Sequence, residues 1–263
     1  MICSPDNYTK HKSCFTKSQL LKFLSFIDKN NEYISFNKNK LWNIVNSHIH
    51  TTYACKHGDE SCWVDKLYVN QNALIPKKPD TWKFNNKTWL TNFDILNVMS
   101  QYEKKYKSFK FIGVVPIDFK DSNGFGGCIS QELCRFKLSN KYSKYAVVFN
   151  LSPHYDSGSH WIALFINTNK RTNNYGCFFF DSNADYIPDE VNDLCNNIIS
   201  QVNDPKFTLH VNDSRKQFKD TECGMFCLNF IIKCLQKHKF DDIVKRKCFD
   251  DDVHKLRNVL FRN

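Results

Sequence analysis

The sequence predicts an α+β fold, because apolar runs of strand length and segments with helical spacing of apolar residues follow one another along the chain. Three runs, at 145–151, 161–166 and 175–180, are short and continuously apolar, which is typical of buried strands. The segment 223–235 is apolar on every side, which predicts a helix buried in the centre of the domain. The 263 residues, with a mass of 31.0 kDa, suffice for one large domain or for a core domain with an appended arm.

The N-terminal part has the pattern of a mainly helical arm. The segments 17–26 and 40–47 resemble short helices separated by polar breaks. A turn-rich stretch with two prolines, at 74–80, follows them and marks a candidate domain boundary. We therefore predict an arm over 1–80, whose function the sequence leaves open, and a core domain over 81–263.

The core domain opens with a helix and a strand. Thr91 or Asn92 can cap a helix that runs to about residue 106, because apolar residues recur there at helical spacing. The run 109–119 has strand character. Pro116 lacks the N–H that a sheet ladder needs, so we expect this strand at an edge, or ending there.

The second half contains a predicted hairpin and two further elements. The runs 161–166 and 175–180 are joined by the polar loop 167–174, which favours an antiparallel pair. Pro188 and the two acidic residues behind it open a helix that continues to about residue 202. The segment 206–211 follows as one more strand.

Charge and composition describe an ordinary globular chain. Its 37 basic and 27 acidic side chains give a net charge of +10, and the basic residues are dispersed. A positive field of this kind still favours salt-dependent contact with polyanions such as DNA. Since no apolar run is long enough to span a membrane and the first residues lack the pattern of a secretory signal, we expect a soluble protein.

Twelve cysteines are a high count for this length. Without a secretory signal, we expect reduced thiols in an intracellular, reducing compartment, most of them buried as small apolar side chains. Potential zinc ligands are close together in one segment, but their spacing lacks the paired Cys-x-x-Cys of structural zinc sites: His48, His50, Cys55, His57 and Cys62. We therefore expect no metal there.

The predicted hairpin places a histidine beside a carboxylate. With a symmetric register, Trp161 faces Phe180, and one step outward His160 faces Asp181. Directly opposed residues of an antiparallel pair project to the same side of the sheet, with Cβ atoms about 5 Å apart. A carboxylate so placed fixes the tautomer and orientation of an imidazole, which suits a general base. A slip of one residue would undo this pairing.

A cysteine at the start of the buried helix is a candidate nucleophile. Helix N-termini carry roughly half a positive charge and favour a thiolate, and among the cysteines Cys223 alone has this position. Gly224 beside it lets a substrate backbone come close. The side-chain amide of Gln217, six residues upstream, can donate to a developing oxyanion together with a backbone N–H near Cys223.

Other residues compete for these roles. His154 could be the base, although it lies in a loop without a strand partner, and Asn183 or Asp185 could supply the orienting group. Cys227, one helical turn after the candidate nucleophile, could be a redox neighbour, but in an apolar helix it fits packing better. Asp118 could contact substrate, although no spacing supports this.

The motifs and their order carry a resemblance to a known family. Gly158-Ser159-His160-Trp161 leads into a strand, Phe179-Phe180-Asp181-Ser182 ends one, and five residues separate Gln217 from Cys223-Gly224. This set resembles the Ulp1/adenain-like cysteine proteases, whose chain order is His, Asp or Asn, Gln, Cys, whereas papain-like proteases place Cys before His. The motifs cover about 145–235, the segment 88–92 looks like the start of the family's first helix, and residues before 80 match no common module of the family.

The resemblance implies a papain-like-superfamily α+β core with a central mixed sheet and a buried helix that bears the nucleophile. It implies that His160 is the general base and that Asp181 orients it. It further implies that Gln217 lines the oxyanion hole and that Cys223 attacks the carbonyl, with no metal or organic cofactor. Trp161 would form the wall of a narrow substrate slot.

Two branches of this family differ in their protein substrates. One deconjugates ubiquitin-like modifiers such as SUMO, and the other processes virion precursors. The composition, which is typical of an AT-rich genome, and the extra N-terminal region are more similar to proteases of large cytoplasmic DNA viruses, of asfarvirus or giant-virus type. This branch implies cleavage after small residues, at Gly-Gly-Xaa-type sites, in the virion and the host cytoplasm. An alternative from another class is a nucleic-acid-binding protein on a protease fold, which would use the charge of +10.

Overall fold

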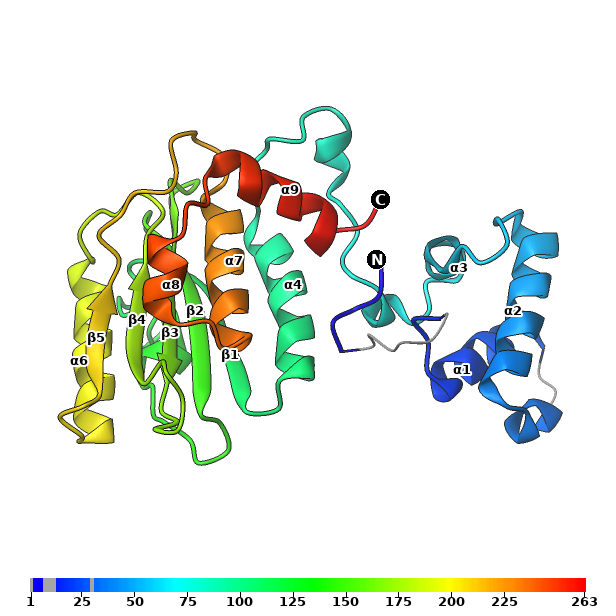
Figure 1. The fold of residues 1–263 in the computed structure, drawn as a ribbon, viewed down its shortest axis with the longest axis horizontal. Coiled ribbons are helices and arrows are strands. Elements are labelled where there is room, and N and C mark those ends of the chain that lie inside the picture. The colour runs from blue at the N-terminus through cyan, green and yellow to red at the C-terminus, as the bar shows by residue number, and fades with distance from the viewer. Residues whose placement is uncertain (1, 7–12, 29–30) are drawn as a thin grey trace. The chain divides into compact units, whose positions relative to one another are not determined.

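The chain forms two compact units. The computed structural model describes residues 2–6, 13–28 and 31–263. The first unit comprises Met1–Lys78 with Asn258–Asn263, and the second comprises Pro79–Arg257 (Figure 1). The predicted boundary lies at residue 80 and leaves the last residues with the core, whereas in the structure residues 258–263 belong to the first unit.

Helices make up the first unit. Its described elements are α1 (Lys17–Ile27), the 3-10 helix η1 (Asn31–Ser35), α2 (Lys38–Tyr53), α3 (Glu60–Leu67) and the 3-10 helix η2 (Gln71–Ala73). Thr16 begins α1 with a capping box, because its hydroxyl accepts from the Gln19 N–H and the Gln19 side chain accepts from the Thr16 N–H. Both helices predicted in this region are present, the second of them longer than predicted, and α3 was not predicted.

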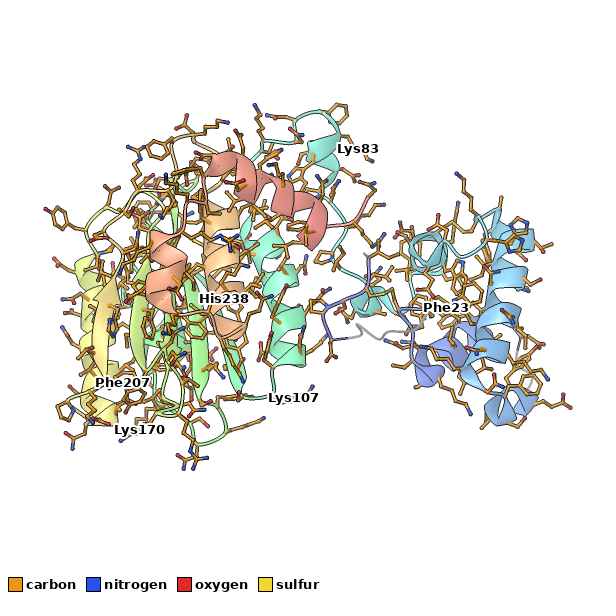
Figure 2. All side chains as sticks on the ribbon, viewed as in Figure 1. Phe23, Lys83, Lys107, Lys170, Phe207 and His238 are labelled. Carbon is orange, nitrogen blue, oxygen red and sulfur yellow. A yellow bond between two sulfur atoms is a disulfide. The ribbon has the colours of Figure 1, made fainter. Side chains whose placement is uncertain are left out.

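An aromatic cluster fills the core of the first unit. The ring centroid of Phe15 lies 4.9 Å from that of Phe23 and 5.9 Å from that of Trp63. All three side chains are fully buried, and Figure 2 labels Phe23 among the helices of this unit. Near the end of the chain, the Arg262 guanidinium donates to the Asp65 carboxylate over 2.7 Å and so holds the pKa of that carboxyl below its usual value.

A five-stranded mixed sheet forms the centre of the second unit. In spatial order its strands are β1 (Phe109–Pro116), β2 (Lys144–Asn150), β3 (Trp161–Asn167), β4 (Gly176–Phe180) and β5 (Thr208–Val211). The outer pairs β1–β2 and β4–β5 are parallel, and the inner pairs β2–β3 and β3–β4 are antiparallel. The predicted α+β fold with a mixed sheet is confirmed. Strand β1 is an edge strand that ends at Pro116, as the missing N–H of this residue predicts.

Helices cover both faces of the sheet. On one face lies α6 (Asp189–Val202), whose Leu194 and Ile198 pack with Leu164 and Phe179 of the strands; Phe207, labelled in Figure 2, joins this cluster. On the other face lie α4 (Asn92–Lys105), α7 (Cys223–Leu235) and α8 (Phe240–Lys245) (Figure 1). Because α7 has packed neighbours on every side, 11 of its 13 residues are buried, as its apolar sequence predicts. The remaining elements are η3 (Asp80–Lys83), α5 (Gln131–Cys134) and α9 (Asp250–Leu260).

The predicted hairpin is antiparallel, but its predicted register is wrong. Ala163 pairs with Phe180, so Trp161 does not face Phe180. The shift amounts to two residues, and a shift by an even number leaves every side chain on its predicted face. With this register extended outward, His160 and Asp181 are diagonal neighbours rather than opposed ones, at a separation that long side chains still bridge.

The loop of the hairpin and the neighbouring strand explain this register. The Asn167 amide donates to the Thr172 hydroxyl over 2.7 Å and to the Asn174 carbonyl, so it binds the loop to the end of β3. Asn167 then pairs with Gly176, the first residue of β4. A Cβ atom at Gly176 would lie 2.5 Å from the Thr208 carbonyl oxygen of β5, so glycine is required where these strands approach.

Six of the twelve cysteines form disulfides, which corrects the expectation that the thiols are reduced. The bonded pairs are Cys3–Cys14, Cys55–Cys62 and Cys128–Cys134. Each pair is at most 11 residues apart in sequence, so local chain geometry brings the sulfur atoms together. The other six remain free, and five of these are buried, as expected for small apolar side chains.

The group of potential zinc ligands is engaged in other contacts. Cys55 and Cys62 are bonded to each other, and the His50 and His57 rings stack with centroids 3.9 Å apart. Within the described residues, no three His, Cys, Asp or Glu side chains are arranged to hold a metal ion. In the same part of the chain, no helix combines the length and apolar character that crossing a bilayer requires.

Truncation of a core residue tests the packing of the sheet on α6. We expect Leu164→Ala to lower the free energy of unfolding by about 2–5 kcal/mol, because Leu164 is fully buried and its loss leaves a cavity. Urea unfolding followed by circular dichroism measures this loss. The control is Val211→Ala at a side chain that is 42% exposed, which should change stability by less than about 0.5 kcal/mol. Equal losses in the two variants would contradict the described packing.

Candidate functional site

His160 and Asp181 meet at one edge of the sheet. His160 directly precedes β3 and Asp181 directly follows β4, and the antiparallel pairing brings these positions to the same end. The His160 Nε2 and Asp181 Oδ1 atoms are 2.6 Å apart, and both side chains are largely buried. The structure thus brings the two predicted residues together, through a diagonal contact.

The surroundings of His160 favour its protonated form. Burial by itself lowers the pKa of His160, but hydrogen bonds and negative charge from Asp181 and Cys223 outweigh burial and raise the pKa to about 9. Because Asp181 occupies Nε2, the nitrogen left to face the Cys223 sulfur is Nδ1. The site therefore suits an imidazolium held between Asp181 and Cys223.

Several donors hold Asp181 in place. Its carboxylate accepts the backbone N–H groups of Asn183, over 2.9 Å, and of Asp185, over 3.3 Å. Its own N–H donates to the Asn212 side-chain oxygen over 2.8 Å, and its carbonyl accepts from the Asn212 amide nitrogen over 2.7 Å. Asn183 and Asp185, which could have taken the place of Asp181, instead support it through their backbones.

Cys223 is the first residue of α7 and is buried. It is close enough to His160 to contribute to the raised pKa of that ring. The preceding residue, Glu222, makes no side-chain capping bond, so it does not occupy the N–H groups of the first turn. Cys227 differs from Cys223, because complete burial raises the pKa of its thiol well above the usual range. Cys227 therefore packs in the core.

Gln217 is fixed beside the strand ends. Its side-chain oxygen accepts from the Ser182 hydroxyl over 2.8 Å, and its backbone N–H donates to the Ser182 carbonyl over 2.9 Å. Since its oxygen is taken, the amide nitrogen is the side-chain atom left to act as a donor. Its carbonyl accepts from Arg215 Nε over 2.6 Å, which fixes the backbone at this position as well.

A groove of about 490 Å³ lies beside Trp161, lined by parts of 89–92, 114–116 and 150–158. The Trp161 indole N–H donates to the Leu90 carbonyl over 3.1 Å, which fixes the ring as a wall of the groove. Gly224, predicted to give space to a substrate, is not part of this lining. A Cβ atom there would lie 3.1 Å from the Leu90 Cβ, so the glycine allows Leu90 to pack against α7.

His154, which lines the same groove, belongs to a second histidine–carboxylate pair. The His154 Nδ1 is 2.7 Å from the Asp118 Oδ2, and the His154 N–H donates to the same carboxylate over 3.0 Å. His154, the alternative base, therefore has a carboxylate partner that the sequence analysis did not foresee. Its side chain is 50% exposed, whereas His160 is the histidine that contacts Cys223.

Sequence reasoning missed Asn212, Ser182 and Leu90. Asn212 follows β5 as Asp181 follows β4, and the ends of parallel neighbours meet at one edge of a sheet. Polar residues directly after two parallel strands were therefore an available signal. No spacing in the sequence points to Leu90, because its contact with Gly224 joins residues that are far apart in the chain.

Comparison with known families gives a match to the family model described as YopJ Serine/Threonine acetyltransferase, over residues 119–259. This match covers more than half of the chain and includes the four predicted catalytic residues. The chain belongs to this family.

Individual relatives are viral proteins named as proteases. A protein of Acanthamoeba polyphaga mimivirus with the provisional name thiol protease is 26% identical, over 100% of this chain and 93% of the relative. A protein of African swine fever virus (isolate Tick/South Africa/Pretoriuskop) named SUMO-1 cysteine protease is 24% identical, over 77% of this chain and 82% of the relative. The crystal structure of the African swine fever virus protease superposes with a TM-score of 0.66 at 20% identity, covering 100% of this chain and 96% of that one.

These comparisons confirm the resemblance to Ulp1/adenain-like cysteine proteases of large cytoplasmic DNA viruses. The solved protease also shares the fold over the full length of the chain. The likeness therefore extends into residues 1–80, where the sequence analysis identified no known module.

Removal of the Asp181 charge tests the electrostatics of His160. In Asp181→Asn, we expect the pH midpoint of the His160 ring to fall by at least about one unit from about 9, because the neutral amide stabilises the imidazolium less. NMR of labelled histidine side chains measures this, with His160→Gln used to assign the signal. An unchanged midpoint would show that the carboxylate does not control the ring.

The same shift predicts how stability depends on pH. The pKa of His160 is raised in the folded state relative to about 6.5 in the unfolded chain. Its contribution to stability is therefore complete below about pH 6.5 and is lost as the pH rises through about 9. Urea unfolding of the wild type and His160→Gln at pH 6 and pH 10 should show a difference between the two proteins that shrinks at the higher pH.

Proposed function

We propose that this chain is a cysteine endopeptidase that cleaves protein substrates after small residues, at sites of the Gly-Gly-Xaa type. The observation that carries the proposal is the buried His160–Asp181 pair in reach of Cys223, since it stabilises the imidazolium that a thiolate nucleophile needs. The names of the viral relatives support the same activity.

The reaction uses these groups in a fixed order. His160 takes the proton of Cys223, or already holds it in an ion pair, and the thiolate attacks the substrate carbonyl. The Gln217 amide nitrogen and a backbone N–H at the start of α7 stabilise the oxyanion. His160 then protonates the leaving amine, and a water molecule activated by the same ring releases the acid from the thioester. Asp181 keeps the ring oriented throughout.

The side chains between the groove and Cys223 support the proposed preference for small residues. The Trp161 ring is fixed by its bond to the Leu90 carbonyl, and Leu90 packs against Gly224, next to the nucleophile. A substrate that passes between these groups to Cys223 has little room for side chains next to the cut bond. Glycine in these positions satisfies this constraint.

The proposed substrates are precursor proteins of a virion. This proposal rests on the similarity of the chain to proteases of two large DNA viruses. It places the enzyme in the virion and in the host cytoplasm, where such particles assemble.

Two other activities have specific support. The name of one relative, SUMO-1 cysteine protease, favours removal of SUMO or a similar modifier, which would use the same chemistry on a folded substrate. The description of the family model favours transfer of an acetyl group to serine or threonine. In that reaction a hydroxyl group, instead of water, would attack the thioester on Cys223.

Cleavage assays with three substrates distinguish these activities. We expect a fluorogenic Gly-Gly-Xaa endopeptide to be cut, with a loss of at least about 10⁴-fold in Cys223→Ala because the nucleophile is removed. Preferential cleavage of folded SUMO conjugates would establish deconjugation instead. Acetylation of a Ser/Thr peptide from acetyl-coenzyme A, without cleavage of the endopeptide or of the SUMO conjugates, would contradict the proposed protease activity.

The role of Gln217 gives a separate kinetic prediction. Gln217→Ala should lower kcat by about 100- to 1000-fold with little change in KM, because it removes a donor to the transition-state oxyanion. The control is Gln236→Ala at the exposed end of α7, which should match the wild type. A change in KM alone would assign Gln217 to substrate binding.

A further inference from the structure

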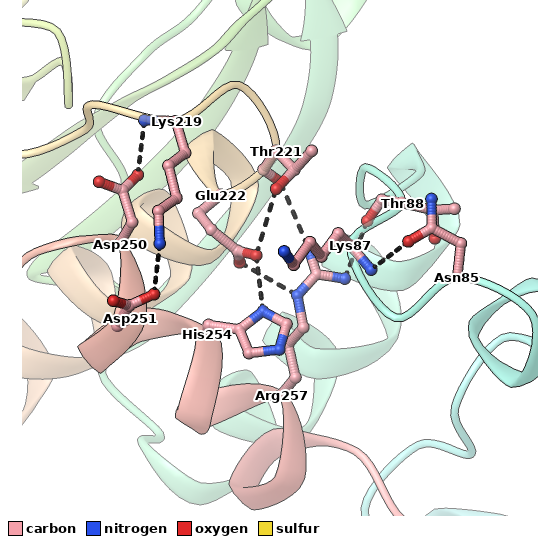
Figure 3. A network of polar contacts seen from close by, with 10 residues as sticks. All are labelled: Asn85, Lys87, Thr88, Lys219, Thr221, Glu222, Asp250, Asp251, His254 and Arg257. Carbon is pink, nitrogen blue, oxygen red and sulfur yellow. Dashed lines mark hydrogen bonds and ion pairs between the residues drawn. The ribbon is translucent and has the colours of Figure 1, made fainter.

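A buried carboxylate stands directly before the nucleophile. The Glu222 side chain is 3% exposed and immediately precedes Cys223 at the start of α7. One carboxylate oxygen accepts from Arg257 Nε over 3.0 Å, and the other lies 2.9 Å from His254 Nδ1 (Figure 3). Both partners come from α9, a helix that the proposed reaction does not otherwise use.

Arg257 holds more than this one carboxylate. Its two terminal nitrogens donate to the Thr88 carbonyl over 2.8 Å and to the Thr221 carbonyl over 3.2 Å. Figure 3 shows this guanidinium between the chain at Thr88 and the turn before α7. Its other face lies 4.5 Å from the centroid of the Trp82 ring, and the side chain is only 2% exposed. The guanidinium therefore fixes the turn before Cys223 and the segment that leads to Leu90.

An unpaired carboxylate at this position would oppose the proposed chemistry in two ways. Its negative charge would destabilise a thiolate on the neighbouring residue. A carboxylate at a helix start also tends to cap the first N–H groups, and a backbone N–H there is needed for the oxyanion. In the structure the Glu222 side chain makes no capping bond, since it turns toward α9.

We propose that Arg257 is a positioning residue for the Cys223 thiolate, because it neutralises Glu222 and holds its carboxylate away from the first turn of α7. The inference rests on the proposed role of Cys223 as nucleophile. It adds to that role a balance of charge between α9 and the start of α7, in which His254 is the second partner of the same carboxylate.

The other charged groups around this site have hydrogen-bond partners of their own, although the Lys219 ammonium also interacts with the charge of Glu222. Asp250 accepts the backbone N–H groups of Phe218 and Lys219, and Lys219 pairs with Asp251 at the exposed end of α9 (Figure 3). On the other side of Cys223, the titratable groups are His160 and Asp181 from the sheet edge and Cys227 from α7.

Two variants should shift the reactivity of Cys223 in opposite directions. Arg257→Met removes the permanent positive charge beside Glu222 and leaves only His254, so the pH midpoint for alkylation of Cys223 should rise, with labelling about tenfold slower on the acid side. Glu222→Gln removes the negative charge and leaves Arg257, so the midpoint should fall. In the double variant Glu222→Gln/Arg257→Met the midpoint should return to near the wild-type value. A purely structural role for Arg257 predicts no such reversal.

The measurement is the rate of iodoacetamide labelling of the Cys223 peptide in the full-length chain, followed by mass spectrometry from pH 4 to pH 10. Lys255→Met is the matched control, because Lys255 lies on the same helix with a side chain that is 76% exposed and should leave the profile unchanged. Labelling by this method does not require a peptide substrate. Slow labelling of wild-type Cys223 at every pH below 8 would overturn the proposed nucleophile itself.

A normal wild-type profile with unshifted variants would overturn only the role of Arg257. If Arg257→Met does not fold, Glu222→Gln still tests the proposal, because it nearly preserves the shape of the side chain and must lower the midpoint. A double variant that labels as slowly as Arg257→Met would show that lost hydrogen bonds, rather than the charge of Glu222, cause the effect, and would likewise overturn the inference.

Discussion

The second unit is organised around the buried carboxylate of Asp181. An ionised group inside a protein is costly unless it is paired and hydrogen-bonded, and this one has donors from several elements. The backbone after β4 and the ring before β3 bind the carboxylate itself, while Asn212 after β5 binds its main chain. The ends of β3, β4 and β5 must therefore be aligned before Asp181 can make all of these hydrogen bonds. The contact that orients His160 thus also fixes how these strand ends align.

The two faces of the sheet contribute differently to the protein: one forms an apolar core, and the other positions the helix that bears Cys223. The face toward α6 is a core of aliphatic and aromatic side chains. The other face carries α7, whose apolar surroundings fix its start at the strand ends, where Cys223 meets His160. Packing along the whole helix thus places Cys223, the proposed nucleophile, beside the polar groups at the strand ends.

The parts of the fold that depend on local patterns could be predicted from the sequence. The strands and the helices α4, α6 and α7 follow from apolar periodicity and capping residues, whereas the mixed sheet was implied by the family resemblance. The contact of His160 with Asp181 was also predicted, although from a register that is two residues off, because the loop bonds of Asn167 and the constraint at Gly176 have no pattern that a sequence displays.

The rest of the site could not be predicted, because it depends on contacts between distant segments. Arg257 donates to the Thr88 carbonyl, although the two residues lie near opposite ends of the core unit's sequence. Leu90 and Gly224 are likewise far apart in sequence and in contact in the structure. The sequence around a single arginine or leucine in a helix or turn does not indicate such a role. The disulfides were not predicted for another reason. The absence of a secretory signal favours reduced thiols, whereas the short spacings of the three bonded pairs favour local disulfides.

The chain order of the two units has a consequence for biosynthesis. The first unit includes residues 258–263, and its Asp65 carboxylate is bound by Arg262. On the ribosome these residues emerge only after the whole of 79–257 has been made, so the first unit cannot acquire this ion pair while the second is still incomplete. The first unit can therefore be completed only in a chain in which every residue of the second unit has already been synthesised.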